Sequence, residues 1–535
     1  MKKIRYTAYA LSSLLLVMLS ACTDFETFNR NPYQITDKSL EQDFNNVGAY
    51  YPAMLNNIFQ DQVAHNLVHE AFVGHLGTPT PFVGNRNNTT YYITWGDSYW
   101  NGVYNNIMAP TYQILNFVIT DENREQFILF EGWAKLIRVI GASRLSAYYG
   151  PIIYTNYGKL EGSHIYDSEE VLYDTWFAEL DEIRAIFEEN IESPALAKFD
   201  ASYSGDVSKW IKVVNSWRLF LAMRLSKVKP DLAKTQGEKA IADPGGLITS
   251  LDDAWYLSLY GGPFRPGRIC FEWGDTRMGA AMESVLGGYN DPRVEKLFDP
   301  ATDESLYPEH PSFPYKGIQS GAYINAKDDR LAFSTIDAQF NSQGNNYNDH
   351  RRMLMPSDVL FTLAEASLRG WAGAGSAKDN YEAGIRASFA EWGAGGVDAY
   401  LENDTDLPMD YVDPKDSRNN FTNRMTVTVK WDEAADNEVK LDKILTQKWI
   451  SAVHNTIEIW VDHRRTGYPK LPYVSKNDSD ATWGVIPPNE FIKRMPFVNG
   501  ERNNNPAGVA DATTKLGGPD EIGTPLWWDV EGPNF

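Results

Sequence analysis

The sequence has few cysteines, few basic residues and no long apolar run. Only two of its 535 residues are cysteines, Cys22 and Cys270, so the fold must rest on a packed core rather than on disulfide bonds. Lysine and arginine together number 49, against 71 aspartates and glutamates, and the formal net charge is −22. This excess of negative charge argues against nucleic acid or an anionic lipid surface as the main partner.

Motifs of several common enzyme classes are also missing. The chain has no Gly-x-Ser-x-Gly, no P-loop and no Gly-x-Gly-x-x-Gly. His65 and His69 lie four residues apart, but the zincin pattern requires glutamate directly after the first histidine, where this chain has Asn66. Glu70 adjoins His69, and on a regular helix it points elsewhere. We therefore predict no catalytic residue, no metal site, no cofactor and no enzymatic activity.

The N-terminus has the features of an export signal. Basic residues at positions 2, 3 and 5 precede an apolar stretch over 6–21, which is short for a transmembrane span and typical of a secretory signal peptide. It ends in Leu19-Ser20-Ala21-Cys22, which resembles the bacterial lipobox. We expect 1–21 to be removed as a lipoprotein signal peptide and Cys22 to carry the lipid, which leaves Cys270 unpaired.

Helical periodicity dominates the chain after residue 38. Apolar residues recur three or four positions apart over 168–190 and 206–229, which predicts two amphipathic helices, the second ended by Pro230. Residues 127–149 are apolar on more than one face and predict a buried helix. The core stripes of the two amphipathic helices are Leu172, Trp176, Leu180, Ile183 and Phe187 in the first, and Trp210, Val214, Trp217, Leu221 and Leu225 in the second.

Three more helices are predicted in the second half of the chain. Segments 360–368 and 381–392 form a helix pair separated by glycines and stopped by Gly393, and 445–460 reads as one further helix. Such pairs resemble tetratricopeptide units.

Long segments between the helices are rich in glycine, proline, asparagine and aromatic residues. They cover roughly 74–100, 243–350, 393–440 and 470–535, where we expect short strands and irregular loops. We divide the chain into the signal peptide at 1–21, a lipidated tether at 22–38 and one ligand-binding domain at 39–535.

Several segments, taken in order, resemble the SusD/RagB family of outer-membrane nutrient-binding lipoproteins. They are 205–210, 215–219, 283–293, 315–318, 364–371, 381–393, 447–450, 460–469 and 527–529. The resemblance implies a mainly α fold, in which tetratricopeptide-like helix pairs stand beside an irregular, loop-rich side with short strands. Residues 23–26, directly after Cys22, also resemble the surface-export signal of Bacteroidota lipoproteins.

The resemblance also implies a role. Members of this family lie on the outer membrane, held by a lipid anchor and facing the cell exterior, where they bind oligosaccharide and deliver it to a TonB-dependent SusC-like transporter. They catalyse no reaction and use no cofactor. Three alternatives stay open: a peptide-binding member of the same architecture, a structural transporter subunit without its own ligand, and a surface glycan hydrolase.

Aromatic residues are abundant, with 29 tyrosines, 25 phenylalanines and 16 tryptophans, and some of them suit sugar binding. Aromatic rings pack on the apolar faces of sugars while amides and arginines bond the hydroxyls. Two loops, 84–100 and 255–275, offer both kinds of residue, although their aromatics could instead fill small local cores. The predicted ligand-binding residues are Arg86, Asn88, Tyr91, Tyr92 and Trp95 in the first loop, and Tyr260, Phe264, Arg265 and Trp273 in the second.

Other prominent side chains are assigned to the core or to structural contacts. Trp100 and Tyr104 lie four residues apart and are counted as core residues of the helix that follows the first loop. The same reasoning places Trp210, Trp217, Trp449 and Trp460 in the core. Arg464 and Arg465 are expected to hold the C-terminal loops.

Overall fold

The computed structural model describes residues 42–58, 62–162, 164–258, 265–344, 348 and 350–535. The predicted signal peptide, the predicted lipidation site Cys22 and the predicted tether lie outside the described residues. The chain divides into two compact units, Met1–Ala49 and Tyr50–Phe535. In the first unit, the 3₁₀ turn η1 (Gln42–Phe44) is followed directly by α4 (Asn45–Gly48). All further elements belong to the second unit.

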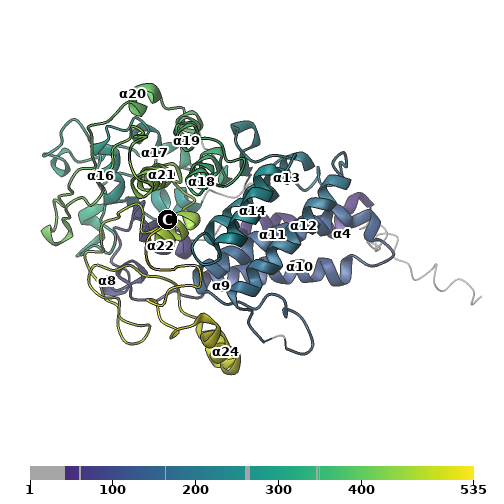
Figure 1. Ribbon diagram of the computed structural model, residues 1–535. Coiled ribbons are helices and arrows are strands. Elements are labelled where there is room, and N and C mark those ends of the chain that lie inside the picture. Colours follow the sequence, from purple (N-terminus) through teal and green to yellow (C-terminus); the bar gives the residue numbers. More distant parts are fainter. Residues whose placement is uncertain (1–41, 59–61, 163, 259–264, 345–347, 349) are drawn as a thin grey trace, which may run out of the picture. The chain divides into compact units, whose positions relative to one another are not determined.

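Four long helices form an array in which each helix packs on the next one in the chain. They are α11 (Arg124–Tyr149), α12 (Glu169–Glu189), α13 (Val207–Arg224) and α14 (Pro230–Ala242), seen side by side in Figure 1. The shorter α5 (Tyr51–Ile58) and α9 (Ser98–Val103) pack against α11. The predicted mainly α fold with helix pairs is confirmed. Within the described residues, no helix has both the length and the apolarity needed to cross a bilayer.

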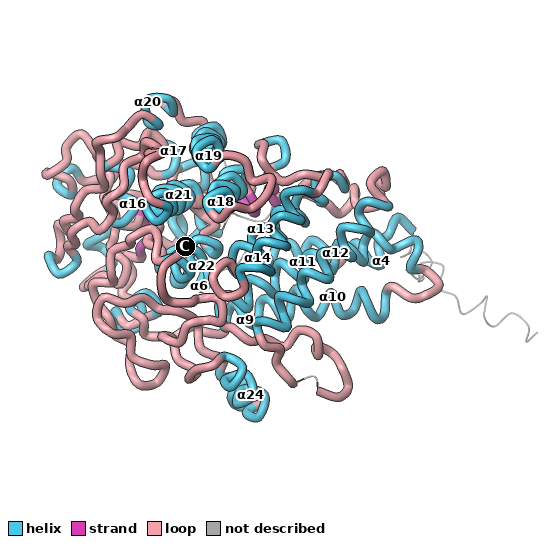
Figure 2. The backbone as a smooth tube through the Cα atoms, in the orientation of Figure 1, coloured by secondary structure: helices cyan, strands magenta, loops and turns pink. Residues whose placement is uncertain are grey.

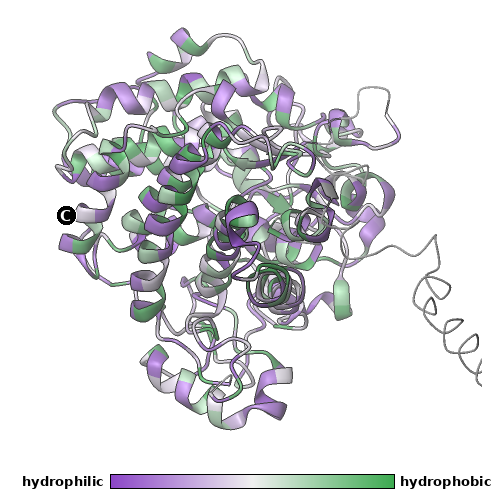
Figure 3. Ribbon diagram, turned by 90° about the vertical axis from the view of Figure 1, so that its right-hand side faces the viewer, coloured by the Kyte–Doolittle hydropathy of each residue, from purple (hydrophilic) through white to green (hydrophobic). Residues whose placement is uncertain are grey.

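The predicted apolar stripes account for this array. The whole stripe of α12 is buried, and Ser168 caps the helix by accepting a hydrogen bond from the backbone N–H of Val171. Asp206 caps α13 in the same way. Figure 3 shows the matching alternation of hydrophobic and hydrophilic residues along the helices.

One predicted helix end is wrong. Pro230 does not end the second amphipathic helix, because α13 already stops at Arg224, and Pro230 is instead the first residue of α14. Proline lacks a backbone N–H, and the first turn of a helix needs no such donor, so proline is well tolerated there.

A second helical group contains α18 (Pro356–Leu368), α19 (Ala377–Trp392), α21 (Asn437–Ser451) and α22 (Ile457–Thr466). The pair α18–α19 confirms the predicted helix pair, and Gly393 ends it with a φ of 63°. The single helix predicted over 445–460 is wrong. The chain breaks between α21 and α22, where His454 adopts a φ of 69°, a left-handed conformation that no regular helix contains.

The remaining chain forms the loop-rich side, which carries two small antiparallel sheets (Figure 2). β1 (Leu76–Gly77) pairs with β3 (Arg277–Met278), with Leu76 opposite Met278. β2 (Trp255–Leu257) pairs with β4 (Arg351–Leu354), and the register shifts between Trp255 and Tyr256. The prediction of irregular loops with short strands is confirmed.

Short helices complete the fold. The α-helical ones are α6 (Gln62–Ala64), α7 (Glu70–Phe72), α8 (Phe82–Asn85), α10 (Ala109–Gln113), α15 (Arg265–Gly267), α16 (Ala280–Gly288), α17 (Val294–Leu297), α20 (Val397–Leu401), α23 (Asn499–Asn504) and α24 (Pro506–Leu516). Four are π-helical: η2 (His65–His69), η4 (Tyr104–Met108), η5 (Ile114–Val118) and η7 (Arg268–Glu272). The further 3₁₀ turns are η3 (Asn88–Thr90), η6 (Leu251–Asp253), η8 (Glu304–Leu306), η9 (Lys327–Arg330), η10 (Ala338–Phe340) and η11 (Ser417–Asn419).

Tryptophans form much of the core, as predicted. Trp210, Trp217, Trp449 and Trp460 are buried, and three of their indole N–H groups have partners inside the protein. Trp210 donates to Asp200, Trp217 to the Ser143 hydroxyl, and Trp449 to the Val73 carbonyl at 2.8 Å. These bonds matter because a buried indole N–H without an acceptor is costly.

The two neighbouring arginines on α22 have different roles. Arg464 donates to the Lys493 carbonyl and lies against the rings of Trp460 and Trp528, so it holds the C-terminal loops as expected. The expectation that Arg465 also holds the C-terminal loops is wrong. Its side chain makes two 2.7 Å hydrogen bonds to Glu365 and so joins α22 to α18.

Glu365 lies fully buried between two arginines, since Arg369 also contacts it at 2.7 Å. Burial alone would raise the pKa of Glu365, but the charges and hydrogen bonds of Arg465 and Arg369 lower it to about 2. The carboxylate therefore stays ionised and paired across the neutral range.

We predict that Glu365→Gln lowers the free energy of unfolding by up to about 3–5 kcal/mol at neutral pH, because it removes the carboxylate that bonds the buried Arg465 twice and leaves that arginine with Asp462 as its remaining acidic partner. A group with a lowered pKa adds stability above its unfolded pKa, here near 4.5, and that stability disappears as the pH falls towards 2. The difference in the free energy of unfolding between variant and parent should therefore shrink as the pH falls from about 4.5 towards 2. Urea unfolding at several pH values measures it.

The matched control is Glu382→Gln, which breaks the exposed pair with Lys378 at 3.4 Å. This change should lower the free energy of unfolding by about 0.3–0.5 kcal/mol. Equal losses in the two variants would contradict a structural role for the buried pair.

Candidate functional site

The segment 78–97, which we call the aromatic loop, leaves the core directly after β1. Its first turn, α8, contains three consecutive left-handed residues: Val83, Gly84 and Asn85 have φ values of 54°, 68° and 62°. For the β-branched Val83 this is a strained conformation, and its side chain is 57% exposed. Strained backbone often occurs where a segment is shaped for binding.

Asn88 holds the aromatic loop together. Its side-chain oxygen accepts hydrogen bonds from the backbone N–H groups of Thr94 and Trp95, at 3.0 and 3.3 Å, and its amide donates to the Trp95 carbonyl. The side chain is fully buried. The structure therefore makes Asn88 a shaping residue of the loop, and not the exposed sugar ligand that the sequence suggested.

The other predicted residues of this loop divide in two. Tyr91 is also buried, packed against Phe72, so it is not available on the surface. Arg86 is exposed and covers the half-buried Tyr92 ring at 4.1 Å, and Trp95 is half-buried. Arg86, Tyr92 and Trp95 thus remain as candidate ligand contacts.

The second predicted loop is placed only in part. Tyr260 and Phe264 lie outside the described residues. Arg265 begins α15 and is half-buried. Trp273 is 37% exposed, which is unusual for a tryptophan in this chain, and it stays a candidate.

The structure joins the end of the second predicted loop to residue 80, which lies at the start of the aromatic loop and just ahead of the first predicted loop. Asp275 accepts a 2.5 Å hydrogen bond from the Thr80 hydroxyl and a 2.6 Å bond from Lys327, whose ammonium also reaches the Trp273 carbonyl. Asp275 lies two residues after Trp273 in the chain. Its hydrogen bond to Thr80 therefore places Trp273 close to the start of the aromatic loop. In Figure 1, α8 marks the aromatic loop on the loop-rich side.

Three further aromatic residues next to this loop were not predicted. Phe82 meets the Trp95 ring edge-on at 5.6 Å. The Arg418 guanidinium lies over the Tyr323 ring, 4.0 Å from its centroid. Tyr323 directly follows Ala322, whose carbonyl accepts a hydrogen bond from the Asn85 side chain. Trp483 lies three residues after Asp480, which pairs with Arg86 at 3.6 Å.

We call this group the aromatic surface. It consists of Phe82, Arg86, Tyr92, Trp95, Trp273, Tyr323, Arg418 and Trp483. Only the tertiary contacts of 322–323 and 480–483 bring the unpredicted members to the loop, so no local pattern in the sequence could have indicated them.

A cleft of about 530 Å³ lies elsewhere, beside α9 and α10. Trp100, Tyr104, Tyr112 and Tyr157 line it together with asparagines and Glu501. Trp100 is buried, as its assignment to the core implies, but Tyr104 is only half-buried and bonds the backbone of Ile153. The cleft is large enough for a small ligand, so both residues also border a second candidate site.

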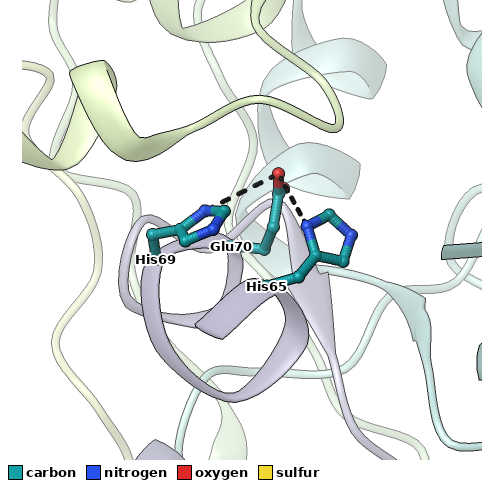
Figure 4. A group of neighbouring side chains, drawn as sticks. All are labelled: His65, His69 and Glu70. Atoms are coloured by element: carbon teal, nitrogen blue, oxygen red, sulfur yellow. Dashed lines mark ion pairs between the residues drawn. The ribbon is translucent and has the colours of Figure 1, made fainter. Parts of the chain in front are cut away.

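The expectation that Glu70 points elsewhere is wrong, because the helix is locally π-helical. Backbone hydrogen bonds run from Glu70 N–H to the His65 carbonyl and from His75 N–H to the Glu70 carbonyl. Each spans five residues, and this wide turn brings residues four and five apart to one face. Figure 4 shows His65 and His69 both turned towards the Glu70 carboxylate.

The comparison with family models gives a match over nearly the whole chain. The model of the SusD and RagB outer-membrane lipoproteins matches residues 27–529. The chain belongs to the SusD-like family. The comparison with curated proteins finds no match.

Solved structures support the same conclusion. A chitin-binding SusD homologue from Flavobacterium johnsoniae is 37% identical, with a TM-score of 0.84, and the match covers 92% of this chain and 100% of that one. A SusD homologue from Bacteroides vulgatus is 32% identical, with a TM-score of 0.82 and the same coverage. A SusD-like protein from Bacteroides thetaiotaomicron is 30% identical, with a TM-score of 0.81, covering 91% of this chain and 99% of that one. The aromatic surface is thus part of a SusD-like fold.

We predict that Asn88→Ala in this SusD-like chain speeds hydrogen exchange of the Thr94 and Trp95 amides about tenfold, because both lose their acceptor. Hydrogen–deuterium exchange with mass spectrometry measures the effect. Asn116→Ala is the control, since its exposed amide bonds only the Tyr112 carbonyl one turn away. Unchanged protection of both amides in Asn88→Ala would contradict the role given to this side chain.

Proposed function

We propose that this SusD-like protein is a cell-surface lipoprotein that binds oligosaccharide and delivers it to a TonB-dependent SusC-like transporter. It acts as a binding protein and not as an enzyme. The aromatic surface is the observation that carries the proposal. It gathers six aromatic rings and two arginines from five separate segments of the chain, and Trp273 in particular is open to solvent.

The chemistry of this surface suits a sugar chain. Trp95 and Trp273 offer apolar rings to the C–H faces of sugar rings. Arg86 and Arg418 lie over the rings of Tyr92 and Tyr323, at 4.1 and 4.0 Å from the ring centroids, and pair with Asp480 and Asp416, so guanidinium N–H donors stand beside the aromatic rings. Such donors bond the hydroxyl and carbonyl oxygens at the rim of a sugar.

The ligand class to test first follows from a relative. The similar protein from Flavobacterium johnsoniae is described as chitin-binding. We therefore propose a chitin-type oligosaccharide as the first ligand, within a panel of other glycans. The aromatic surface itself would suit any glycan with exposed apolar ring faces.

We predict saturable binding of one glycan class by calorimetric titration. Trp95→Ala and Trp273→Ala should each weaken it at least about tenfold, that is by about 1.4 kcal/mol, since central aromatic contacts dominate such interfaces. Tyr112→Ala is the comparison, because Tyr112 lines the separate 530 Å³ cleft and should leave the affinity unchanged.

Four outcomes would contradict the proposal. A loss of affinity in Tyr112→Ala alone would move the site to the cleft. Binding heat with peptide digests but not with glycans would favour the peptide-binding alternative. No binding heat with either would favour a structural transporter subunit. Release of reducing ends over time would indicate a hydrolase.

Delivery to a transporter requires attachment to the outer membrane. We predict that Cys22→Ala moves the protein from the membrane fraction to the soluble fraction, because two or three acyl chains at Cys22 supply the anchor. Immunoblots of cell fractions measure this, and Cys270→Ala is the control because that thiol is buried in the fold. Membrane association that persists in Cys22→Ala would rule out this anchor. Co-purification of the parent protein with a large outer-membrane barrel protein tests the partner.

A further inference from the structure

Glu70 lies in the core with an imidazole nitrogen near each oxygen of its carboxylate. The Nδ1 atoms of His65 and His69 lie 3.6 and 3.9 Å from Oε1, and Nδ1 of His75 lies 3.6 Å from Oε2. All four side chains are buried. These three separations are too long for hydrogen bonds. The histidines therefore surround the carboxylate without bonding it directly.

The separations suit a shared metal ion. Zinc binds histidine nitrogen at about 2.0–2.1 Å and carboxylate oxygen at about 2.0–2.2 Å, so two tetrahedral ligands lie roughly 3.4 Å apart. The His65 and His69 distances to Oε1 exceed this by only a few tenths of an ångström. The ligand atoms of His65, His69 and Glu70 all lie within 4.8 Å of one another. Figure 4 shows both rings directed at the same oxygen.

We propose that His65, His69 and Glu70 form a structural binding site for a divalent transition-metal ion, with zinc as its occupant. The ligand set is two imidazoles and one carboxylate, which suits zinc and related ions rather than calcium. His75 takes the outer position, with its Nδ1 3.6 Å from the second carboxylate oxygen, where a small shift on metal binding would let it donate to that oxygen and orient Glu70.

The three ligands lie in one segment, 65–70, and neighbouring side chains link this segment to other parts of the fold. His69 Nδ1 now lies 2.7 Å from the Thr456 hydroxyl, at the N-terminus of α22. When His69 binds the ion, this hydroxyl stays within reach of Glu70 and can bond it instead. His75 directly precedes β1, so by fixing Glu70 and His69 the ion would act on the base of the aromatic loop and on α22 indirectly, through His75 and Thr456.

Metal analysis tests the proposal on the full chain, purified in detergent without a histidine tag. After incubation with zinc chloride and desalting, elemental analysis should find one zinc ion per chain. Cobalt in its place should give the visible absorption bands of low-coordinate Co²⁺, and bound zinc should raise the melting temperature. A zinc content no higher than that of Glu70→Gln, or no response to cobalt, would overturn the proposal.

The variants separate this site from surface binding. Glu70→Gln keeps the size of the side chain but should abolish retention of zinc, and circular dichroism establishes that it folds. If it does not fold, His65→Gln replaces it. His75→Asn should weaken zinc binding about 10–100-fold without abolishing it, as expected of an outer partner. His164→Ala removes an exposed histidine and should retain zinc as the parent does; loss of zinc in this control would overturn the assignment.

Discussion

The position of the aromatic loop depends on how the segment from His65 to Gly77 is held inside the core. This segment is buried, so each of its polar groups needs a partner within the protein. The Trp449 indole supplies one by donating to the Val73 carbonyl, and the Gly279 N–H supplies another by donating to the His75 carbonyl. Gly279 can come this close only because it lacks a side chain: a Cβ would lie 2.0 Å from the Gly74 oxygen.

The helical frame and the candidate surface are therefore connected by few but specific contacts. The helices supply rigidity through apolar stripes and buried ion pairs such as that of Arg465 with Glu365. The aromatic loop leaves this frame at β1 and is then shaped by its own asparagine, Asn88, and by the strained backbone of its first turn. Because the loop is held in shape before binding, little conformational entropy of the loop should be lost when a sugar chain binds.

Much of the fold could be predicted from the sequence, because helices with one buried stripe repeat every three or four residues. The helix pair at 356–392 and the stripe of α12 follow from that pattern. Two helix ends could not be predicted in this way. Pro230 can start a helix as well as end one, and the left-handed conformation of His454 is set by its tertiary surroundings. Glu70 was misjudged for a related reason, since a π-turn places residues five apart on one face.

The candidate site was less predictable than the fold. The sequence correctly indicated that the loops at 84–100 and 255–275 are rich in aromatics, but it could not tell an exposed Trp273 from a buried Tyr91. That difference depends on contacts between distant segments, such as Thr80 with Asp275 and Asn85 with Ala322. These contacts cannot be predicted from the composition of the loops or the spacing of their residues.

A crystal structure of the chain with a bound chitin oligosaccharide tests the central claim most directly. Our account places sugar rings against Trp95 and Trp273, with hydroxyls bonded by Arg86 or Arg418. Sugar bound in the cleft of Trp100 and Tyr112, with the aromatic surface left empty, would contradict it.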